Sequence, residues 1–234
     1  MSPPEIDLAP ELIGQVLDAV EEGFERQLAF TQQMMSLDST RGNEHRAQAC
    51  FFEALESRGF EMDQWSIDIA EIEDHPGFSP VKVDYDNAVN VVGTHTPVET
   101  KGRSLILNGH VDVVPTGPAD MWTRPPFEPW VEGDWLYGRG GADMKAGLCA
   151  NLAALDALKT LGWQPAARVH IQSVTEEECT GNGALSALVR GYRAEAALIP
   201  EPEENMLVRA NTGVIWFRVH VRGRPVHVRE AGCL

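Results

Sequence analysis

The sequence predicts an α/β protein with a mostly parallel sheet and flanking helices. Apolar runs of strand length alternate with stretches of helical periodicity along the 234 residues, the order that parallel strands with helical connections produce. Hydrophobic residues make up 43% and charged residues 23%, values typical of folded globular chains. No internal repeat or low-complexity tract interrupts the pattern.

Two helices are predicted to open the fold. Pro10 suits the first helical position, where a backbone N–H is not needed. Apolar residues then recur at helical spacing, at positions 13, 17, 20, 24 and 28. A second helix is predicted over residues 44–57, and Gly59 ends it.

Strands are predicted in the next part of the chain. Residues 60–69 form an extended stretch, and residues 87–92 and 104–108 read as buried strands. A loop rich in tryptophan and proline, residues 115–130, precedes a short extended piece at 135–137.

The alternation of helix and strand continues to about residue 200. Residues 144–161 predict a helix with leucines along one face, which Gly162 ends. A strand at 168–174, a helix at 183–190 and a strand at 196–199 follow.

The composition changes near the end of the sequence. From Met206 onward there are five arginines and one acidic residue. Residues 214–222 alternate between two faces, which predicts an antiparallel strand with one solvated face. A second domain is therefore predicted to begin near residue 210, dividing the chain into 1–209 and 210–234.

Charge and cysteine content exclude several classes of function. The net charge of −16 argues against a nucleic-acid or anionic-membrane surface. No apolar run of about 18 residues is present, so no membrane span is predicted, and the N-terminus lacks the pattern of a secretory signal. The cysteines are widely spaced, which suggests reduced thiols and a cytoplasmic location: they are Cys50, Cys149, Cys179 and Cys233.

Polar side chains follow the predicted strand at 104–108. In open α/β sheets, ligands bind at the carboxyl ends of strands. His110 and Asp112 are two residues apart, so in extended chain they project to one side. Asp112 could then accept the second ring N–H of His110, a common arrangement for a metal-bound imidazole. A surface histidine and aspartate in a turn is the alternative interpretation.

A glycine-rich segment, residues 138–143, leads into the helix predicted at 144–161. Asp143 by itself would suit an N-cap. The alternative is a carboxylate between two metal ions, with the glycines allowing the backbone to approach. The segment matches neither GxxxxGK[ST] nor GxGxxG, so a phosphate-binding loop is not predicted.

Three adjacent carboxylates, Glu176, Glu177 and Glu178, follow the strand at 168–174. The N-terminus of the next helix would stabilise acids there. Three neighbouring carboxylates nevertheless repel one another unless a cation is present, which favours a cation site. Cys179 could be called a nucleophile, but carboxylates raise a thiol pKa, and this alternative is disfavoured.

The fourth strand end carries Glu201, between two prolines that stiffen its backbone. A solvated loop glutamate is the alternative, but Glu201 is the fourth metal-type residue at a fourth strand end. One histidine with several carboxylates suits Zn²⁺, with Co²⁺ or Mn²⁺ as alternatives.

Four motifs in this order resemble the M20 metallopeptidase family, in particular the acetylornithine deacetylase and succinyl-diaminopimelate desuccinylase group. The motifs are Asn-Gly-His-Val-Asp (108–112), Gly-Arg-Gly-Gly-Ala-Asp-Met-Lys (138–145), Glu-Glu-Glu-Cys-Thr-Gly-Asn-Gly (176–183) and Pro-Glu-Pro (200–202). The resemblance covers about residues 25–231. It implies a zinc-exopeptidase-like catalytic domain, incomplete here, followed by the start of an α+β lid domain.

The resemblance also implies residue roles. Two divalent metal ions, Zn²⁺ foremost, would be held by His110, Asp143, Glu178 and Glu201, with Asp143 bridging both ions. Three further residues would act in the reaction: Asp112 would orient His110, Glu177 would be the general base, and His227 would stabilise the tetrahedral oxyanion.

The implied reaction is removal of the acyl group from a small N-acyl amino acid. A carboxypeptidase or dipeptidase of the same family, acting on a short peptide, is one alternative, and a non-catalytic metal-binding module is another. In the family, the lid also forms a homodimer, and a returning part of the catalytic domain supplies one more histidine ligand. Because this chain ends at Leu234, we expect weak or no hydrolysis, weak binding of the second metal and exposed apolar surface.

Overall fold

The computed structural model describes residues 9–81 and 83–204 and, beyond these, residues 206–208, 210, 213, 217, 219–223 and 225. Contacts divide the chain into two units, Met1–Pro202 and Glu203–Leu234. The helices and strands below all lie in the first unit. The domain start predicted near residue 210 stays a prediction. Of the strand predicted over 214–222, residues 214–216 and 218 lie outside this set, and residues 217 and 219–222 do not form a strand.

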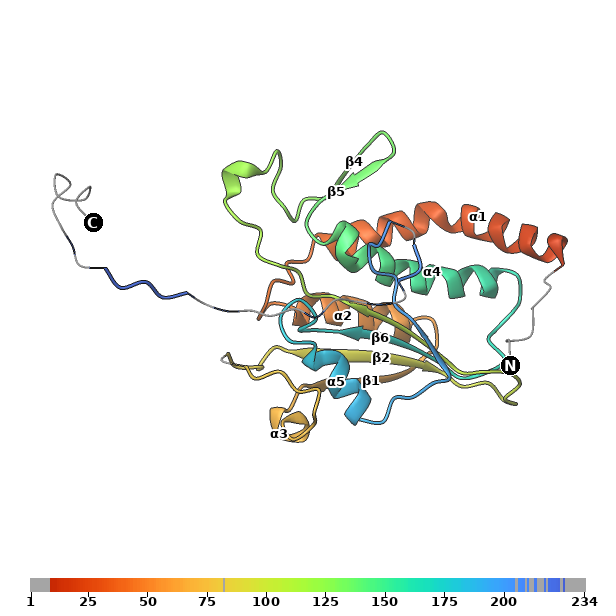
Figure 1. Cartoon of the computed structure of the whole chain (residues 1–234). Coiled ribbons are helices and arrows are strands. Elements are labelled where there is room, and N and C mark those ends of the chain that lie inside the picture. The colour runs from red at the N-terminus through yellow and green to blue at the C-terminus, as the bar shows by residue number, and fades with distance from the viewer. Residues whose placement is uncertain are drawn as a thin grey trace. The chain divides into compact units, whose positions relative to one another are not determined.

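A five-stranded sheet forms the centre of the first unit (Figure 1). Its strands, in spatial order, are β1 (Glu61–Ser66), β2 (Val89–His95), β6 (Val169–Val174), β3 (Leu105–His110) and β7 (Ala196–Leu198). β6, β3 and β7 are parallel, whereas β2 is antiparallel to both of its neighbours. Four of the five strands therefore share one direction, which confirms the predicted mostly parallel α/β sheet.

Helices cover both faces of this sheet (Figure 1). On one face, α1 (Pro10–Met35), α2 (His45–Glu56) and α4 (Ala146–Thr160) enclose a core that includes Phe51, Leu107 and Ile171. On the other face, α3 (Ile69–Ile72) and α5 (Asn182–Val189) pack over two smaller clusters. No helix among the described residues combines the length and the apolar character needed to cross a bilayer.

Most of the predicted elements form close to the predicted positions. α1 begins at Pro10, with the proline in its first turn, and α2 and α4 begin and end within two residues of the prediction. A hairpin of β4 (Trp130–Glu132) and β5 (Trp135–Tyr137) occurs where only its second strand was predicted. The short helix α3 and a 3-10 turn at Ala119–Met121 were not predicted.

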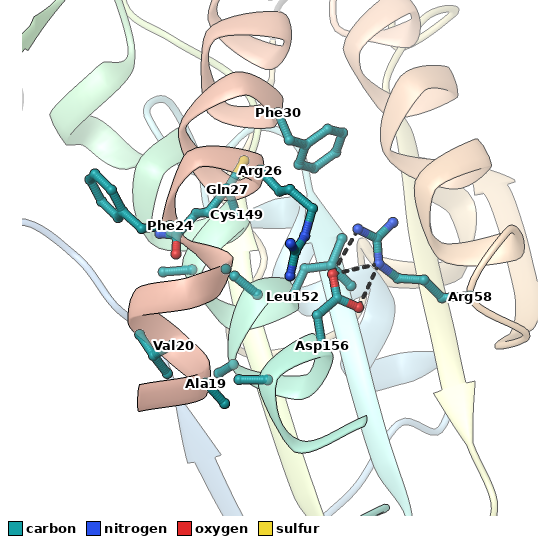
Figure 2. Close-up of a pocket in the computed structure, with 15 residues that line it drawn as sticks. Ala19, Val20, Phe24, Arg26, Gln27, Phe30, Arg58, Cys149, Leu152 and Asp156 are labelled. Atoms are coloured by element: carbon teal, nitrogen blue, oxygen red, sulfur yellow. Dashed lines mark hydrogen bonds and ion pairs between the residues drawn. The ribbon is translucent and has the colours of Figure 1, made fainter. Parts of the chain in front are cut away.

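The apolar stripe that predicts α1 is largely exposed at its N-terminal end. Ile13, Leu17, Val20 and Phe24 are 44%, 61%, 41% and 49% exposed. Beside this stripe, a cavity of about 400 Å³ lies between α1 and α4, lined mainly by small and apolar side chains (Figure 2). The ion pair between Arg58 and Asp156 is its main charged feature.

Candidate metal centre

Three parallel strands bring their carboxyl ends to one edge of the sheet. β3 ends in His110, β6 runs into residues 175–178, and β7 precedes Glu201. Because β3 lies between β6 and β7, these three segments are neighbours. A kinked turn, Gly141–Lys145, comes before α4 and carries Asp143.

The His110 ring lies at the centre of a group of carboxylates. Its Nε2 atom is 3.0 Å from Asp143 Oδ1, 3.7 Å from Glu177 Oε2 and 3.8 Å from Glu201 Oε1. Two sets of three ligand atoms each lie within 4.8 Å of one another: His110 with Glu177 and Glu201, and His110 with Asp143 and Glu178. The structure thus brings the four predicted metal residues and the predicted base together.

The imidazole and the carboxylates differ in exposure. The His110 side chain is fully buried, whereas those of Asp143 and Glu177 are about half exposed and that of Glu201 is 29% exposed. These carboxylates are therefore accessible to solvent, whereas the imidazole is not.

Asp143 does not cap a helix. The N-terminus of α4 has no side-chain capping bond, and the backbone of Asp143 is non-helical, with φ −116° and ψ 101°. Its side chain contacts His110 instead, so the N-cap interpretation is wrong.

The glycines before Asp143 are required by packing. A Cβ atom at Gly140, whose φ is +73°, would lie 2.5 Å from Val113, and one at Gly141 would lie 2.8 Å from Met35. Close packing against Val113 and Met35 thus favours glycine at both positions. The expectation that the glycines let the backbone approach a ligand stays a prediction.

Asp112 orients His110 differently from the expected way. The Nδ1 atom of His110 is 2.8 Å from the backbone carbonyl oxygen of Asp112, whereas the carboxylate oxygen Oδ1 is 3.6 Å away. A carbonyl only accepts, so Nδ1 carries the hydrogen, and in the neutral ring the lone pair is on Nε2, facing the carboxylates. The Asp112 carboxylate accepts a hydrogen bond from the Glu178 backbone N–H at 3.1 Å.

Neighbouring negative charges raise the pKa values of the titratable groups at this site. Burial lowers the pKa of His110, but Asp112, Glu201 and Glu177 outweigh it and raise the pKa to about 10. Burial, together with the neighbouring carboxylates, raises the pKa of Glu201 to about 7 despite the opposing effect of His110. The same causes raise the pKa values of Glu177 and Glu178.

The donor set fits a divalent metal ion. Converging carboxylates with raised pKa values bind either protons or a metal ion, since both relieve their mutual repulsion. Among the described residues, the buried Asp112 Oδ1 has no hydrogen-bond partner, which leaves further negative charge beside His110. An imidazole with several carboxylates is a donor set that Zn²⁺ accepts.

Glu176 belongs to a different group of residues. Its carboxylate is 2% exposed and forms an ion pair with Arg41 at 2.6 Å. The repulsion expected among three adjacent carboxylates therefore involves only Glu177 and Glu178, because a guanidinium neutralises the third.

The Cys179 thiol does not have the character of a nucleophile. Partial burial raises its pKa, Arg41 opposes this, and neighbouring carboxylates including Glu176 add to the rise. The prediction that carboxylates raise this thiol pKa is confirmed in direction. Cys50, Cys149 and Cys179 are free thiols.

Sequence reasoning missed residues that support the site. The buried Lys145 donates from Nζ to the carbonyl oxygens of Met34 and Leu37, each at 2.9 Å, and so ties the start of α4 to the end of α1. Lys145 is the last residue of the motif at 138–145, two residues after Asp143. This position was the only feature of the sequence that pointed to its role. Arg41, far from Glu176 in sequence, gave no signal. His227 lies outside the described residues, so its role stays a prediction.

Comparisons with known proteins point to one family. The model of peptidase family M20/M25/M40 matches residues 106–231, more than half of the chain. A deformylase of Halalkalibacterium halodurans, acting by its name on N-formyl-4-amino-5-aminomethyl-2-methylpyrimidine, is 31% identical over 214 residues, covering 89% of this chain and 46% of the relative. A probable succinyl-diaminopimelate desuccinylase of Staphylococcus aureus is 35% identical over 143 residues, covering 60% of this chain and 34% of the relative. The chain spans half or less of the length of these relatives.

Solved structures share the fold. Human carnosine dipeptidase 1 matches with a TM-score of 0.64 and 19% identity, over 80% of this chain and 41% of the other. An M20 family metallo-carboxypeptidase from Sulfolobus solfataricus matches with a TM-score of 0.59 and 19% identity, over 74% and 37%. At these identities the matches concern the fold.

Proposed function

The chain belongs to peptidase family M20/M25/M40, and from this premise we propose that it carries the metal-binding part of an amide hydrolase acting on N-acyl amino acids. The observation that supports the proposal most is the placement of His110 Nε2 within 3.0–3.8 Å of carboxylates from three separate segments. The reaction would release the acyl group by hydrolysis of a linear amide bond.

In this proposal, two divalent ions, Zn²⁺ foremost and Co²⁺ as an alternative, bind at the cluster. His110 and Glu201 would hold one ion, Glu178 the other, and Asp143 would contact both. When bound, such ions supply Lewis acidity, which lowers the pKa of a water towards 7 and polarises the scissile carbonyl.

Glu177 is the proposed general base. Its Oε2 lies at the edge of the cluster, 3.7 Å from His110 Nε2, and its side chain is half exposed. Its raised pKa, caused first by burial, brings it closer to the operating pH, where a base both accepts and returns a proton. Glu177 would take the proton of the attacking water at Oε2 and later deliver it to the leaving amine.

Removal of an acyl group is favoured over peptide cleavage. Three relatives that are at least 31% identical and match 60–89% of this chain are named as a deformylase and desuccinylases. The dipeptidase resemblance comes from structures below 25% identity and concerns the fold. A dipeptidase or carboxypeptidase acting on a short peptide is the second candidate. The same proposal includes three further points. His227 would stabilise the oxyanion, the protein would form a dimer, and its location would be cytoplasmic.

A zinc titration combined with a substrate screen tests this proposal. We expect the metal-free chain to take up zinc. Because the chain spans half or less of its relatives' length, we expect the zinc-loaded chain to hydrolyse one or more N-acyl amino acids only weakly, a turnover that a chelator abolishes. Zinc uptake without hydrolysis of any N-acyl amino acid or dipeptide would support a non-catalytic metal-binding module. A chain that takes up no zinc would contradict the proposed centre itself.

A further inference from the structure

Glu176, Glu177 and Glu178 are consecutive in sequence, yet their side chains have different partners. Glu177 and Glu178 belong to the two ligand groups around His110, and Glu176 belongs to neither. The φ angle of Glu176 is +66°, in the left-handed region that residues with a side chain rarely adopt and that persists only when the surroundings hold it.

Two distant segments hold the Glu176 carboxylate. The Nε and Nη2 atoms of Arg41 donate to Oε1 and Oε2, each at 2.6 Å, which is the bidentate geometry of the strongest guanidinium–carboxylate pairs. Tyr85 donates from its hydroxyl to Oε2 at 2.7 Å. Asn182 in turn donates to the Tyr85 hydroxyl at 3.0 Å. Within the turn, the Thr180 hydroxyl also donates to Oε2, at 3.1 Å. The carboxylate is thus held both by its own turn and by two segments outside it.

The backbone of Glu176 closes the turn that carries the two site carboxylates. Its carbonyl oxygen accepts from the N–H groups of Thr180 at 2.9 Å and Gly181 at 2.8 Å. Within the same turn, the Glu178 N–H donates to Asp112. Glu176 and Asp112 therefore hold the turn on either side of Glu177.

We propose that the Arg41–Glu176 ion pair, supported by Tyr85, is a positioning device that sets where Glu177 and Glu178 stand relative to His110. The inference rests on the proposed metal centre and adds to it residues that contact neither metal nor substrate. Arg41 and Tyr85 reach the turn from segments 135 and 91 residues away in sequence, so the device couples the first and last thirds of the described chain.

A positioning role and a purely electrostatic role of Arg41 predict opposite changes in metal affinity when Arg41 is removed. If Arg41 acted only as a positive charge near the site, removing it would strengthen cation binding, because the remaining charges would be more negative. If Arg41 holds the turn in place, removing it displaces two carboxylates and weakens binding. The direction of the change in metal affinity therefore separates the two roles.

The test measures zinc affinity of the 234-residue chain by competition with a chromophoric chelator. We expect Arg41→Ala to weaken zinc binding by about 10- to 100-fold, the usual cost of losing a residue that supports metal ligands. Tyr85→Phe, which keeps the ring and all charges, should weaken it less but in the same direction. Arg41→Lys should recover part of the loss. The visible spectrum of bound Co²⁺ should change in Arg41→Ala.

The matched control is Arg58→Ala, which removes a bidentate arginine–aspartate pair beside the cavity between α1 and α4 (Figure 2). Its zinc affinity and Co²⁺ spectrum should equal those of the wild type. Unchanged or tighter zinc binding in both Arg41→Ala and Tyr85→Phe overturns this inference alone. A wild-type chain that takes up no zinc overturns the metal centre together with it.

Discussion

Glu176, Glu177 and Glu178 are neighbours in one turn, but they lie in different surroundings. Glu176 is neutralised by Arg41, Glu178 has its backbone held by Asp112, and Glu177 is half exposed at the edge of the cluster. Because all three residues are glutamates, the type of side chain does not determine the role proposed for each. The contacts of each residue do, and substituting the glutamates one at a time tests this.

Glu177→Gln should separate catalysis from metal binding. The amide keeps the size of the side chain but takes up no proton, so turnover should fall by about 100-fold or more. Zinc content should remain close to that of the wild type, whereas Glu178→Gln should lose zinc. Metal analysis and steady-state kinetics check both variants. Loss of zinc in Glu177→Gln with retention in Glu178→Gln would mean that the base and the ligand are exchanged.

Glu44 gives the metal-free protein a pH-dependent stability. Its side chain is buried and accepts a hydrogen bond from the Gly42 N–H at 2.8 Å, and burial raises its pKa to about 7. Because this folded-state pKa lies above the unfolded value of 4.5, its contribution is present below pH 4.5 and is lost as the pH rises through 7. In the wild type, this group should lower the free energy of unfolding by about 2–3 kcal/mol between pH 5 and pH 8. Glu44→Gln should abolish this decrease, because the amide does not titrate.

Urea unfolding in the presence of a chelator measures this effect. Glu56→Gln, an exposed position on α2, is the control and should follow the wild type at both pH values. If the free energies of unfolding of Glu44→Gln and the wild type differ equally at the two pH values, Glu44 is not the group responsible.

At the scale of elements, the site depends on how closely the start of α4 approaches the loop after β7. A Cβ atom at Gly147 would lie 2.2 Å from the Pro200 carbonyl oxygen. Glu201 follows directly, so the contact that admits only glycine also sets the position of a proposed ligand.

Gly147→Ala should move this loop and damage the metal centre. The clash with backbone cannot be relieved by a side-chain rotation, so we expect a loss of about 1–3 kcal/mol in the free energy of unfolding and weaker zinc binding. Gly14→Ala is the control. Gly14 lies within α1, and apart from its own helix backbone no atom of the described residues lies within 4 Å of the added methyl, so the substitution should stabilise by up to about 1 kcal/mol. Wild-type stability and zinc affinity in Gly147→Ala would contradict the close approach.

Some helices and strands could be predicted from the sequence, and other features of the fold could not. α1, α4 and β6 follow from periodicity and from proline and glycine signals, and they form nearly where predicted. The reversed direction of β2 could not be predicted, because strand propensity and burial are the same in either direction. The pairing of Arg41 with Glu176 was equally inaccessible, because an exposed loop arginine has no local pattern and its partner is 135 residues away.

At the scale of the whole molecule, the proposed metal ligands are brought together by the arrangement of the strand ends and not by any single sequence motif. His110, Asp143, Glu178 and Glu201 come from four segments that the parallel strands and α4 bring to one edge. This convergence could be predicted because strand direction places carboxyl ends together. The orienting carbonyl of Asp112 could not, since it depends on a turn geometry that sequence spacing does not specify.

Metal binding should therefore stabilise the whole first unit. An ion that joins four segments binds the folded chain and not the unfolded one, so zinc at about 100 times its dissociation constant adds about 2.7 kcal/mol. Thermal unfolding with and without zinc checks this, with His110→Ala as the control that should show no zinc-dependent shift. An equal shift in His110→Ala would place the stabilising ion elsewhere.

The most direct test of the metal centre is anomalous X-ray diffraction at the zinc edge from a zinc-loaded crystal. We predict two anomalous peaks at the carboxyl edge of the sheet, with Asp143 in contact with both. The stronger peak should lie about 2.0–2.2 Å from His110 Nε2 and a Glu201 oxygen, and the weaker one should be bound by Glu178, because weak binding of the second metal is expected. Peaks elsewhere, or these four side chains directed to separate places in the metal-loaded protein, would contradict the account.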